Sequence, residues 1–286
     1  MKEIKFLIYD VREQTDNRDE NGVKDREFVR YFNDGVKTIQ VLIFKNNPLC
    51  SYYQEPVIYS PINNLREHDL HSDCFGDNAV SLVQIESEGK WFPLERVWPE
   101  DGNTFFGWYT RNKQVVISGA PDRTISQRIK VWYFKRLPRF DKAWATVVSV
   151  AGQVITLSNV DAEMFKVDRF ISILTVDGAV RVANLSFVKT TDTTITVVGS
   201  LAGVVASDVI VMGKNSLMTV DIPEECEPYL MDYVAQRVVG RNNYTEDWNK
   251  MNFWTSEERG NIISIFADAS QAEVRAPITD TDYLGI

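Results

Sequence analysis

Two stretches of the sequence, VSVAGQVIT (148–156) and VKTTDTTIT (188–196), lie 40 residues apart and agree at three positions: Val148, Ile155 and Thr156 recur as Val188, Ile195 and Thr196. The match continues downstream at two further positions of each copy, Asp168 and Ile171 in the first and Asp208 and Val211 in the second. Both copies are rich in Val, Ile and Thr, which favour strands. The pattern predicts a three-strand unit that occurs twice and can close into a small barrel without open edges.

The region around this repeat is poor in charge. Residues 143–218 contain 11 charged residues among 76, compared with 25% for the whole chain. We therefore expect an inserted all-β domain at 143–218, inside a body made of residues 1–142 and 219–286. Two unrelated hairpins of similar composition are the alternative explanation of the repeat.

Helical periodicity marks both ends of the body. Apolar residues from Ile4 to Val11 predict a short amphipathic helix, and a longer helix is predicted from about Asp25 to Phe44. Near the C-terminus, the run from Asp221 to Glu224 predicts a helix start, with a stop near Gly240. A second helix is expected from 243–246 to about Asp268, followed by an extended tail at 269–286.

Short β-rich runs lie between these helices, around Ile58 and at 80–85, 105–109, 114–118 and 129–134, with a hairpin turn expected at 110–113. The predicted fold class is therefore α+β. The N- and C-terminal helix pairs are expected to form one bundle, with a β-rich middle and the inserted barrel.

Charge and composition limit the possible functions. The 286 residues leave room for two domains, and 31 basic against 40 acidic residues give a net charge of −9. This balance argues against an extended surface for nucleic-acid phosphates. Residues 219–286 carry 13 acidic and 5 basic residues, so most of the excess lies there. These acidic residues form either a solvated face of the protein or, if several copies assemble into a ring, the wall of a central channel that repels DNA.

The sequence predicts that the protein has no membrane partner and that it resides in a reducing compartment. Its apolar runs are too short to cross a bilayer, and Glu3 and Asp10 interrupt the N-terminal segment where a signal peptide needs an apolar stretch. Three cysteines, Cys50, Cys74 and Cys226, are an odd number at wide spacing and do not resemble a disulfide framework.

Few residues point to catalysis or metal binding. The spacing His68-x-x-His71-x-x-Cys74 could supply metal ligands, but a solvated loop is the favoured interpretation. The polar run at 17–22 begins like a calcium loop, yet the position of its glutamate ligand falls on Phe28. No phosphate-binding glycine motif is present. We expect no catalytic residue, no cofactor and no metal.

Aromatic and basic residues are clustered. The 33 aromatic residues could form a binding platform for a sugar or a partner protein. The favoured interpretation is that most of them occupy alternating strand positions that face the core. The stretch RIKVWYFKRLPRFDK (128–142) is basic. It could pair with an acidic neighbouring subunit or form an ordinary solvated strand edge.

Three segments together resemble the head-to-tail connector proteins of tailed bacteriophages, also described as adaptor or tail-tubular-A-like proteins. They are EFVRYFNDGVKTIQVLI (27–43), RLPRFDK (136–142) and IPEECEPYLMDYVAQRVVGRNN (222–243). In that family, an N-terminal and a C-terminal helix pair form one bundle, with β-structure and variable insertions between them. The repeat-containing insert is a departure from the smallest members.

The resemblance implies a structural protein of the virion neck or tail, assembled in the host cytoplasm as a ring of about twelve copies beneath the portal protein. The ring would extend the channel for double-stranded DNA, without sequence-specific binding, and would dock the next tail component. Candidate docking residues are Arg136, Arg139 and the apolar tip Tyr283, Leu284 and Ile286. The alternative is another tail or baseplate component that binds a partner or glycan through its β domain.

Overall fold

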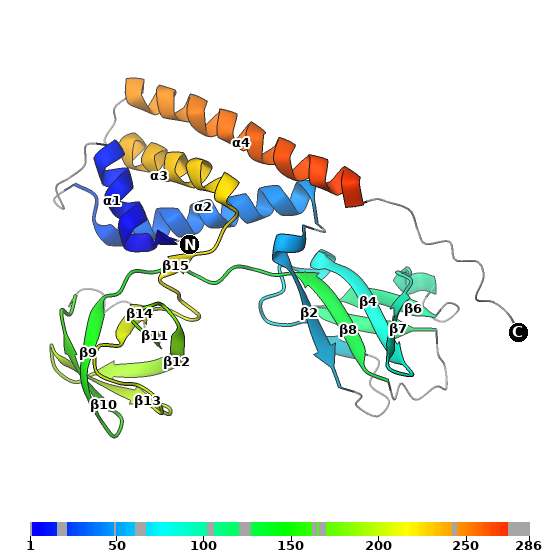
Figure 1. Ribbon diagram of the computed structural model, residues 1–286, viewed down its shortest axis with the longest axis horizontal. Coiled ribbons are helices and arrows are strands. Elements are labelled where there is room, and N and C mark those ends of the chain that lie inside the picture. Colours follow the sequence, from blue (N-terminus) through cyan, green and yellow to red (C-terminus); the bar gives the residue numbers. More distant parts are fainter. Residues whose placement is uncertain are drawn as a thin grey trace, which may run out of the picture. The chain divides into compact units, whose positions relative to one another are not determined.

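The computed structural model describes residues 2–15, 22–48, 50–60, 67–101, 106–119, 127–161, 165, 170–241 and 245–273 (Figure 1). The chain divides into two compact units. The first unit comprises Met1–Ile39 and Leu137–Arg259, and the second comprises Gln40–Arg136 and Gly260–Ile286. Helices α2 (Asp25–Asn46) and α4 (Thr245–Glu273) contribute residues to both units. The fold is mixed α+β, as the sequence predicts.

A closed barrel of six antiparallel strands belongs to the first unit. Its strands follow one another around the barrel in the order β10-β13-β12-β11-β14-β9, and β9 pairs with β10 to close it. The predicted closed barrel is confirmed. Its strands are β9 (Ala145–Ala151), β10 (Val154–Ser158), β11 (Phe170–Leu174), β12 (Val180–Lys189), β13 (Thr194–Val198) and β14 (Val209–Met212).

The pairing of these strands reflects the sequence repeat. Each residue of one copy has an equivalent 40 positions away in the other copy. When both residues of a pair between β10 and β13, or between β11 and β14, are replaced by their equivalents, the register of the two strands is unchanged. The pair Ile155–Ile195 maps onto itself. A β-bulge after Thr156 breaks this symmetry between β9 and β10. The exchanged pairs are Val154–Thr196 with Thr156–Thr194, and Ile171–Met212 with Ser172–Val211.

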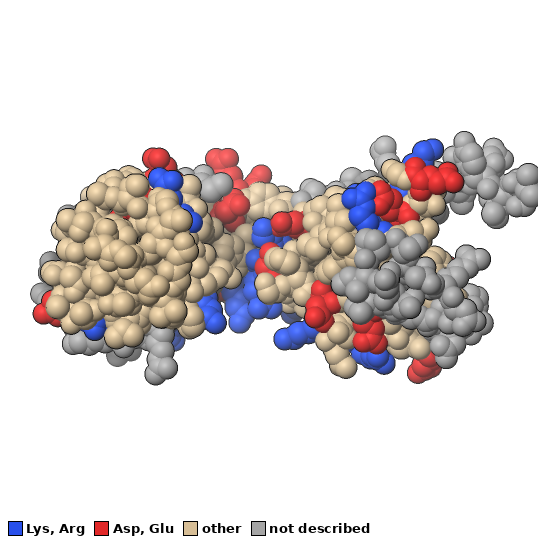
Figure 2. Space-filling view, turned by 90° about the horizontal axis from the view of Figure 1, so that it is seen from below, with Lys and Arg blue, Asp and Glu red and all other residues tan. Residues whose placement is uncertain are grey.

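Alternation of side chains explains why the barrel closes. Branched apolar residues such as Ile155, Ile171 and Ile195 point inward and are buried, while Val148 and Val188 at equivalent repeat positions are exposed. The barrel face turned to the viewer in Figure 2 carries few charges, because its described residues are mostly tan, the colour of uncharged residues.

Three helices of the first unit are closely packed. Helix α1 (Ile4–Gln14) buries the predicted apolar face, and α3 (Glu227–Arg241) buries Leu230, Val234 and Val238. Gly35 of α2 lies against α3, because a Cβ atom at this position would be only 2.6 Å from Leu230 Cδ1. Gln236 of α3 donates a hydrogen bond of 2.8 Å to Asn252 of α4.

The N-terminus joins the chain where it leaves the barrel. Strand β1 (Lys2–Glu3) pairs antiparallel with β15 (Thr219–Val220). The amide of Ile4 continues this contact with a hydrogen bond of 2.9 Å to the Met218 carbonyl. The first residues of α1 are therefore fixed to the exit of the barrel.

The second unit contains two sheets. One has the order β2-β8-β4-β5 and the other β3-β7-β6. Phe134 is completely buried, and its ring centre lies 4.9 to 5.5 Å from those of Tyr53, Phe44 and Phe75. The strands are β2 (Gln54–Tyr59), β3 (Glu67–Asp69), β4 (Val80–Ser87), β5 (Lys90–Leu94), β6 (Gly107–Arg111), β7 (Gln114–Ser118) and β8 (Ile129–Phe134).

Several predicted boundaries are wrong. The hairpin turn is Asn112-Lys113, two residues with φ of 53° and 62°, because Thr110 and Arg111 continue β6. Helix α3 begins at Glu227 after a 3₁₀ turn at Glu224–Cys226, later than the predicted start at Asp221. Helix α4 extends to Glu273, beyond the predicted end at Asp268.

Gly35 generates a stability prediction. Gly35→Val places new atoms against buried Leu230, so we expect a loss of about 2 kcal/mol of unfolding free energy from overpacking. Gly260→Val in α4 is the matched control, because a Cβ there meets nothing within 4 Å. Urea denaturation of both variants measures the difference. Equal effects at the two glycines would show that the close approach of α2 and α3 is unimportant.

Candidate functional site

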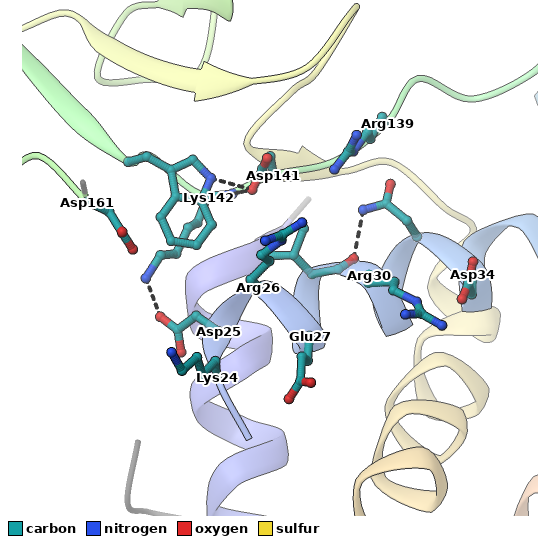
Figure 3. A pocket seen from close by; sticks show the side chains of 13 residues that line it. Lys24, Asp25, Arg26, Glu27, Arg30, Asp34, Arg139, Asp141, Lys142 and Asp161 are labelled. Atoms are coloured by element: carbon teal, nitrogen blue, oxygen red, sulfur yellow. Dashed lines mark hydrogen bonds and ion pairs between the residues drawn. The ribbon is translucent and has the colours of Figure 1, made fainter. Parts of the chain in front are cut away.

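A pocket of about 840 Å³ opens in the first unit beside the N-terminal half of α2 (Figure 3). Its walls are residues 24–34, the segment 139–144 that leads into the barrel, and Asp161. Ten of its thirteen lining residues are charged, five basic and five acidic. The pocket includes Arg139, one of the two arginines singled out in the sequence.

Asn33 of α2 fixes the segment that forms the opposite wall. Its Nδ2 donates to the Phe140 carbonyl at 2.7 Å, and its Oδ1 accepts from the Phe140 amide at 2.9 Å. The side-chain amide therefore pairs with the backbone as a neighbouring strand would. Nδ2 also donates to the Val29 carbonyl at 2.7 Å, which holds the side chain on the helix.

The other edge of this segment pairs with the chain that leaves the barrel. The Leu217 amide donates to the Arg139 carbonyl at 2.9 Å, and the Asp141 amide donates to the Leu217 carbonyl at 2.8 Å. Phe140, completely buried, lies between the two contacts. The entry and the exit of the barrel are thus fastened to each other and, through Asn33, to α2.

Asp25, the first residue of α2, is held by two cations. Arg12 of α1 donates to its Oδ1 at 2.7 Å, and Lys142 forms an ion pair with its Oδ2. Burial by itself would raise the pKa of Asp25, but the hydrogen bonds and charges of Lys142 and Arg12 outweigh it, and the net effect lowers that pKa. This carboxylate joins α1, α2 and the barrel entry.

Asp141 is also engaged within the pocket wall. Its Oδ1 accepts hydrogen bonds from Trp144 Nε1 at 2.7 Å and from the Lys142 amide at 2.8 Å. Lys142 Nζ lies 4.4 Å from the centre of the Trp144 ring, a cation–π distance. Donors of the protein itself therefore occupy Asp25 and Asp141.

Three exposed arginines, Arg26, Arg30 and Arg139, line the same pocket. In Figure 3 the Arg26 side chain is directed toward the segment at 139–142, whereas Glu27 points away from it. Glu27 forms an ion pair with Arg241 of α3. Guanidinium groups bind carboxylates, phosphates and aromatic faces, so the pocket is suited to hold part of a partner molecule.

The sequence indicated some of these residues and not others. The basic stretch at 128–142 points to Arg139, whereas Asn33, Arg26 and Arg30 do not stand out in the sequence. The spacing of these three residues, four and then three positions, could have indicated that they belong together, because it places them on one face of a helix.

The remaining predicted docking residues lie elsewhere. Arg136 belongs to the second unit, where its Nη2 donates to the Phe75 carbonyl at 3.2 Å and its amide to the Asp73 carbonyl at 2.6 Å. The structure does not place it in the pocket. Tyr283, Leu284 and Ile286 lie outside the described residues, as does most of the polar run considered for calcium.

The candidate metal ligands serve other contacts. His68 is buried on β3, and burial lowers its pKa. His71 is hydrogen-bonded to Asp73, which also accepts from Tyr133 Oη at 2.7 Å. Burial raises the pKa of the Cys74 thiol. Among the described residues, no group of three or more His, Cys, Asp or Glu is arranged to hold a metal ion.

No described helix combines the length and the apolar character needed to cross a membrane. No protein-family model matches the sequence, and no curated protein matches it.

The Asn33 pairing is testable by mutation. Asn33→Ala leaves the buried amide and carbonyl of Phe140 without their partner, so we expect a loss of about 2 to 3 kcal/mol of unfolding free energy. Asn46→Ala is the control, because Asn46 makes the same bond to a carbonyl four residues earlier in the same helix. Its expected cost is below about 0.5 kcal/mol. A similar cost for both variants in urea titrations would contradict this role.

The lowered pKa of Asp25 predicts a pH dependence. The carboxylate contributes stability at a pH above its unfolded-state pKa, and that contribution is lost as the pH falls through the lower folded-state pKa. Asp25→Asn should therefore cost roughly 1 to 2 kcal/mol near neutral pH and progressively less in acid. Thermal unfolding from neutral pH to acid pH tests this, with exposed Asp34→Asn as the control. A cost that does not change with pH would refute it.

Proposed function

We propose that this chain is a structural subunit of the head-to-tail connector of a tailed bacteriophage. In this role, about twelve copies form a ring beneath the portal in the virion neck, extend the DNA channel and dock the next tail component. The subunit has no catalytic function. It contributes surfaces for its neighbours in the ring, for the portal and for the tail.

One observation carries the proposal: residues of all three segments that resemble connector proteins are in contact within the first unit. The first segment, on α2, pairs with RLPRFDK through Asn33 and Phe140. It also contacts the third segment, on α3, through Gly35 against Leu230 and through the ion pair of Glu27 with Arg241. The three segments are therefore linked by direct contacts, as the parts of one structural body are.

The closed barrel fits the proposed role as an insertion in a connector body. Its entry and exit are paired at Phe140 and Leu217, so a domain at 143–218 can be added without separating the two parts of the body. We include in the proposal a body of residues 1–142 and 219–286, in which the two helix pairs form one bundle.

Charge is compatible with a DNA channel. Residues 219–286 carry 13 acidic and 5 basic residues. If these helices face the lumen of the ring, their negative charge repels the phosphate backbone and allows DNA to slide without binding.

A second candidate, a different tail or baseplate component, is favoured by the outer face of the barrel. Val148, Val188 and Val198 are exposed there. Among the described barrel residues, the strongly exposed large apolar side chains are valines and not aromatics. This composition suits a protein partner better than a glycan, which is usually held by aromatic rings.

Cryo-EM of the phage particle that carries this chain tests the proposal. We expect density for the fold on the portal axis, repeated around the ring between portal and tail. Labelling with an antibody against the chain should mark the neck. Density at a tail fibre or baseplate, with none at the neck, would replace the connector by the second candidate.

A further inference from the structure

Two adjacent aromatic side chains of α4 are exposed to water. Phe253 is 67% exposed and Trp254 is 45% exposed, whereas the next residue, Thr255, is buried. Glu257 is also exposed and follows them by one helical turn, so it lies on the same side of the helix. Aromatic residues are enriched at the centres of protein interfaces. This α4 face, Phe253, Trp254 and Glu257, therefore has the composition of a contact surface.

The pocket beside α2 has complementary features. Its volume of about 840 Å³ is sufficient for large side chains. Arg26 and Arg30 are exposed on its wall, and guanidinium groups can cover an aromatic ring and form paired hydrogen bonds with a carboxylate. Asp25 is held by Arg12 and Lys142, so this acid does not oppose an incoming carboxylate.

Charge favours a second copy of this chain as the occupant. The α4 face offers the exposed carboxylate of Glu257, and the pocket wall, with five basic and five acidic lining residues, offers the exposed guanidinium groups of Arg26 and Arg30. Both surfaces occur on every copy. Because they are different surfaces, their contact is heterologous and produces a ring or a filament, the geometry that a connector requires.

The expected contact between two copies is weak. An aromatic side chain buries about 150 to 250 Å². The exposed parts of Phe253 and Trp254 therefore supply roughly a quarter of the 800 Å² that each partner contributes to a stable interface. The aromatic pair can serve as an anchor, while closure of the ring makes many weak contacts cumulative.

We propose that the α4 face of one copy docks into the arginine-lined pocket of the next, with Trp254 and Phe253 as anchors and Glu257 facing Arg26 and Arg30. This inference rests on the proposed ring function and deepens it by naming the contact between subunits.

Sedimentation equilibrium of the full chain up to about 0.5 mM tests the contact. We expect the wild type to associate, and both Trp254→Ala and Arg26→Glu/Arg30→Glu to weaken association at least about tenfold. Lys37→Glu and Phe6→Ala are matched controls, because they change an exposed cation of α2 and an exposed aromatic of α1 outside the proposed contact. Both should associate like the wild type.

Mixing the two defective variants tests the heterologous geometry. The Arg26→Glu/Arg30→Glu chain keeps its α4 face, and the Trp254→Ala chain keeps its pocket. An equimolar mixture should therefore form a one-to-one complex that does not grow, although neither variant associates alone. Adding Glu257→Arg to the Arg26→Glu/Arg30→Glu chain should restore part of the self-association by reversing both charges.

Three results would overturn the inference: a wild type that stays monomeric throughout this concentration range, association that neither defective variant weakens, or a mixture that forms no complex. The pocket would then belong to another partner, such as the portal. These failures are distinct from failure of the proposed function. A particle with the chain in a neck ring but unaffected by Trp254→Ala would disprove only the contact, and a confirmed contact in a chain absent from the neck would disprove only the connector.

Discussion

The pairing of the Asn33 side chain with the Phe140 backbone is the contact on which the first unit depends. Segment 139–141 has two edges that need hydrogen bonds, and a helix has no free backbone groups along its side to supply them. Asn33 solves this by presenting one donor and one acceptor, while Leu217 occupies the other edge. The barrel can then begin and end at the same place on the helices, and β1 adds the N-terminus to that place.

The candidate site is a product of the same arrangement. The Asn33 side chain bridges α2 and segment 139–141. Longer side chains surround this bridge, and the pocket lies among them. Its acids Asp25 and Asp141 serve the architecture by binding Arg12, Lys142 and Trp144. Arg26, Arg30 and Arg139 stand at the exposed side of the pocket. Asp25, Asp141 and Lys142 therefore hold the architecture together, while the exposed Arg26 and Arg30 carry the proposed contact with a partner.

Periodic features of the fold could be predicted from the sequence, and non-periodic ones could not. The repeat predicts the closed barrel, and the spacing from Ile4 to Val11 predicts the buried face of α1. The short strands β3 and β5 were not predicted. The three residues of β3 are too few to show alternation, and β5 (KWFPL) contains a proline, which a strand at a sheet edge tolerates. The pocket escaped as well: Asn33 and Phe140 are 107 residues apart, and no local pattern relates them.

The preserved register of the barrel has a further consequence. Since exchange of the two copies leaves Ile155 opposite Ile195 and the other pairs of β10 and β13 interchanged, each half offers the edges that the other half needs. A single three-strand unit is in this sense its own complement, because a second copy of the same unit supplies the partners for its open edges.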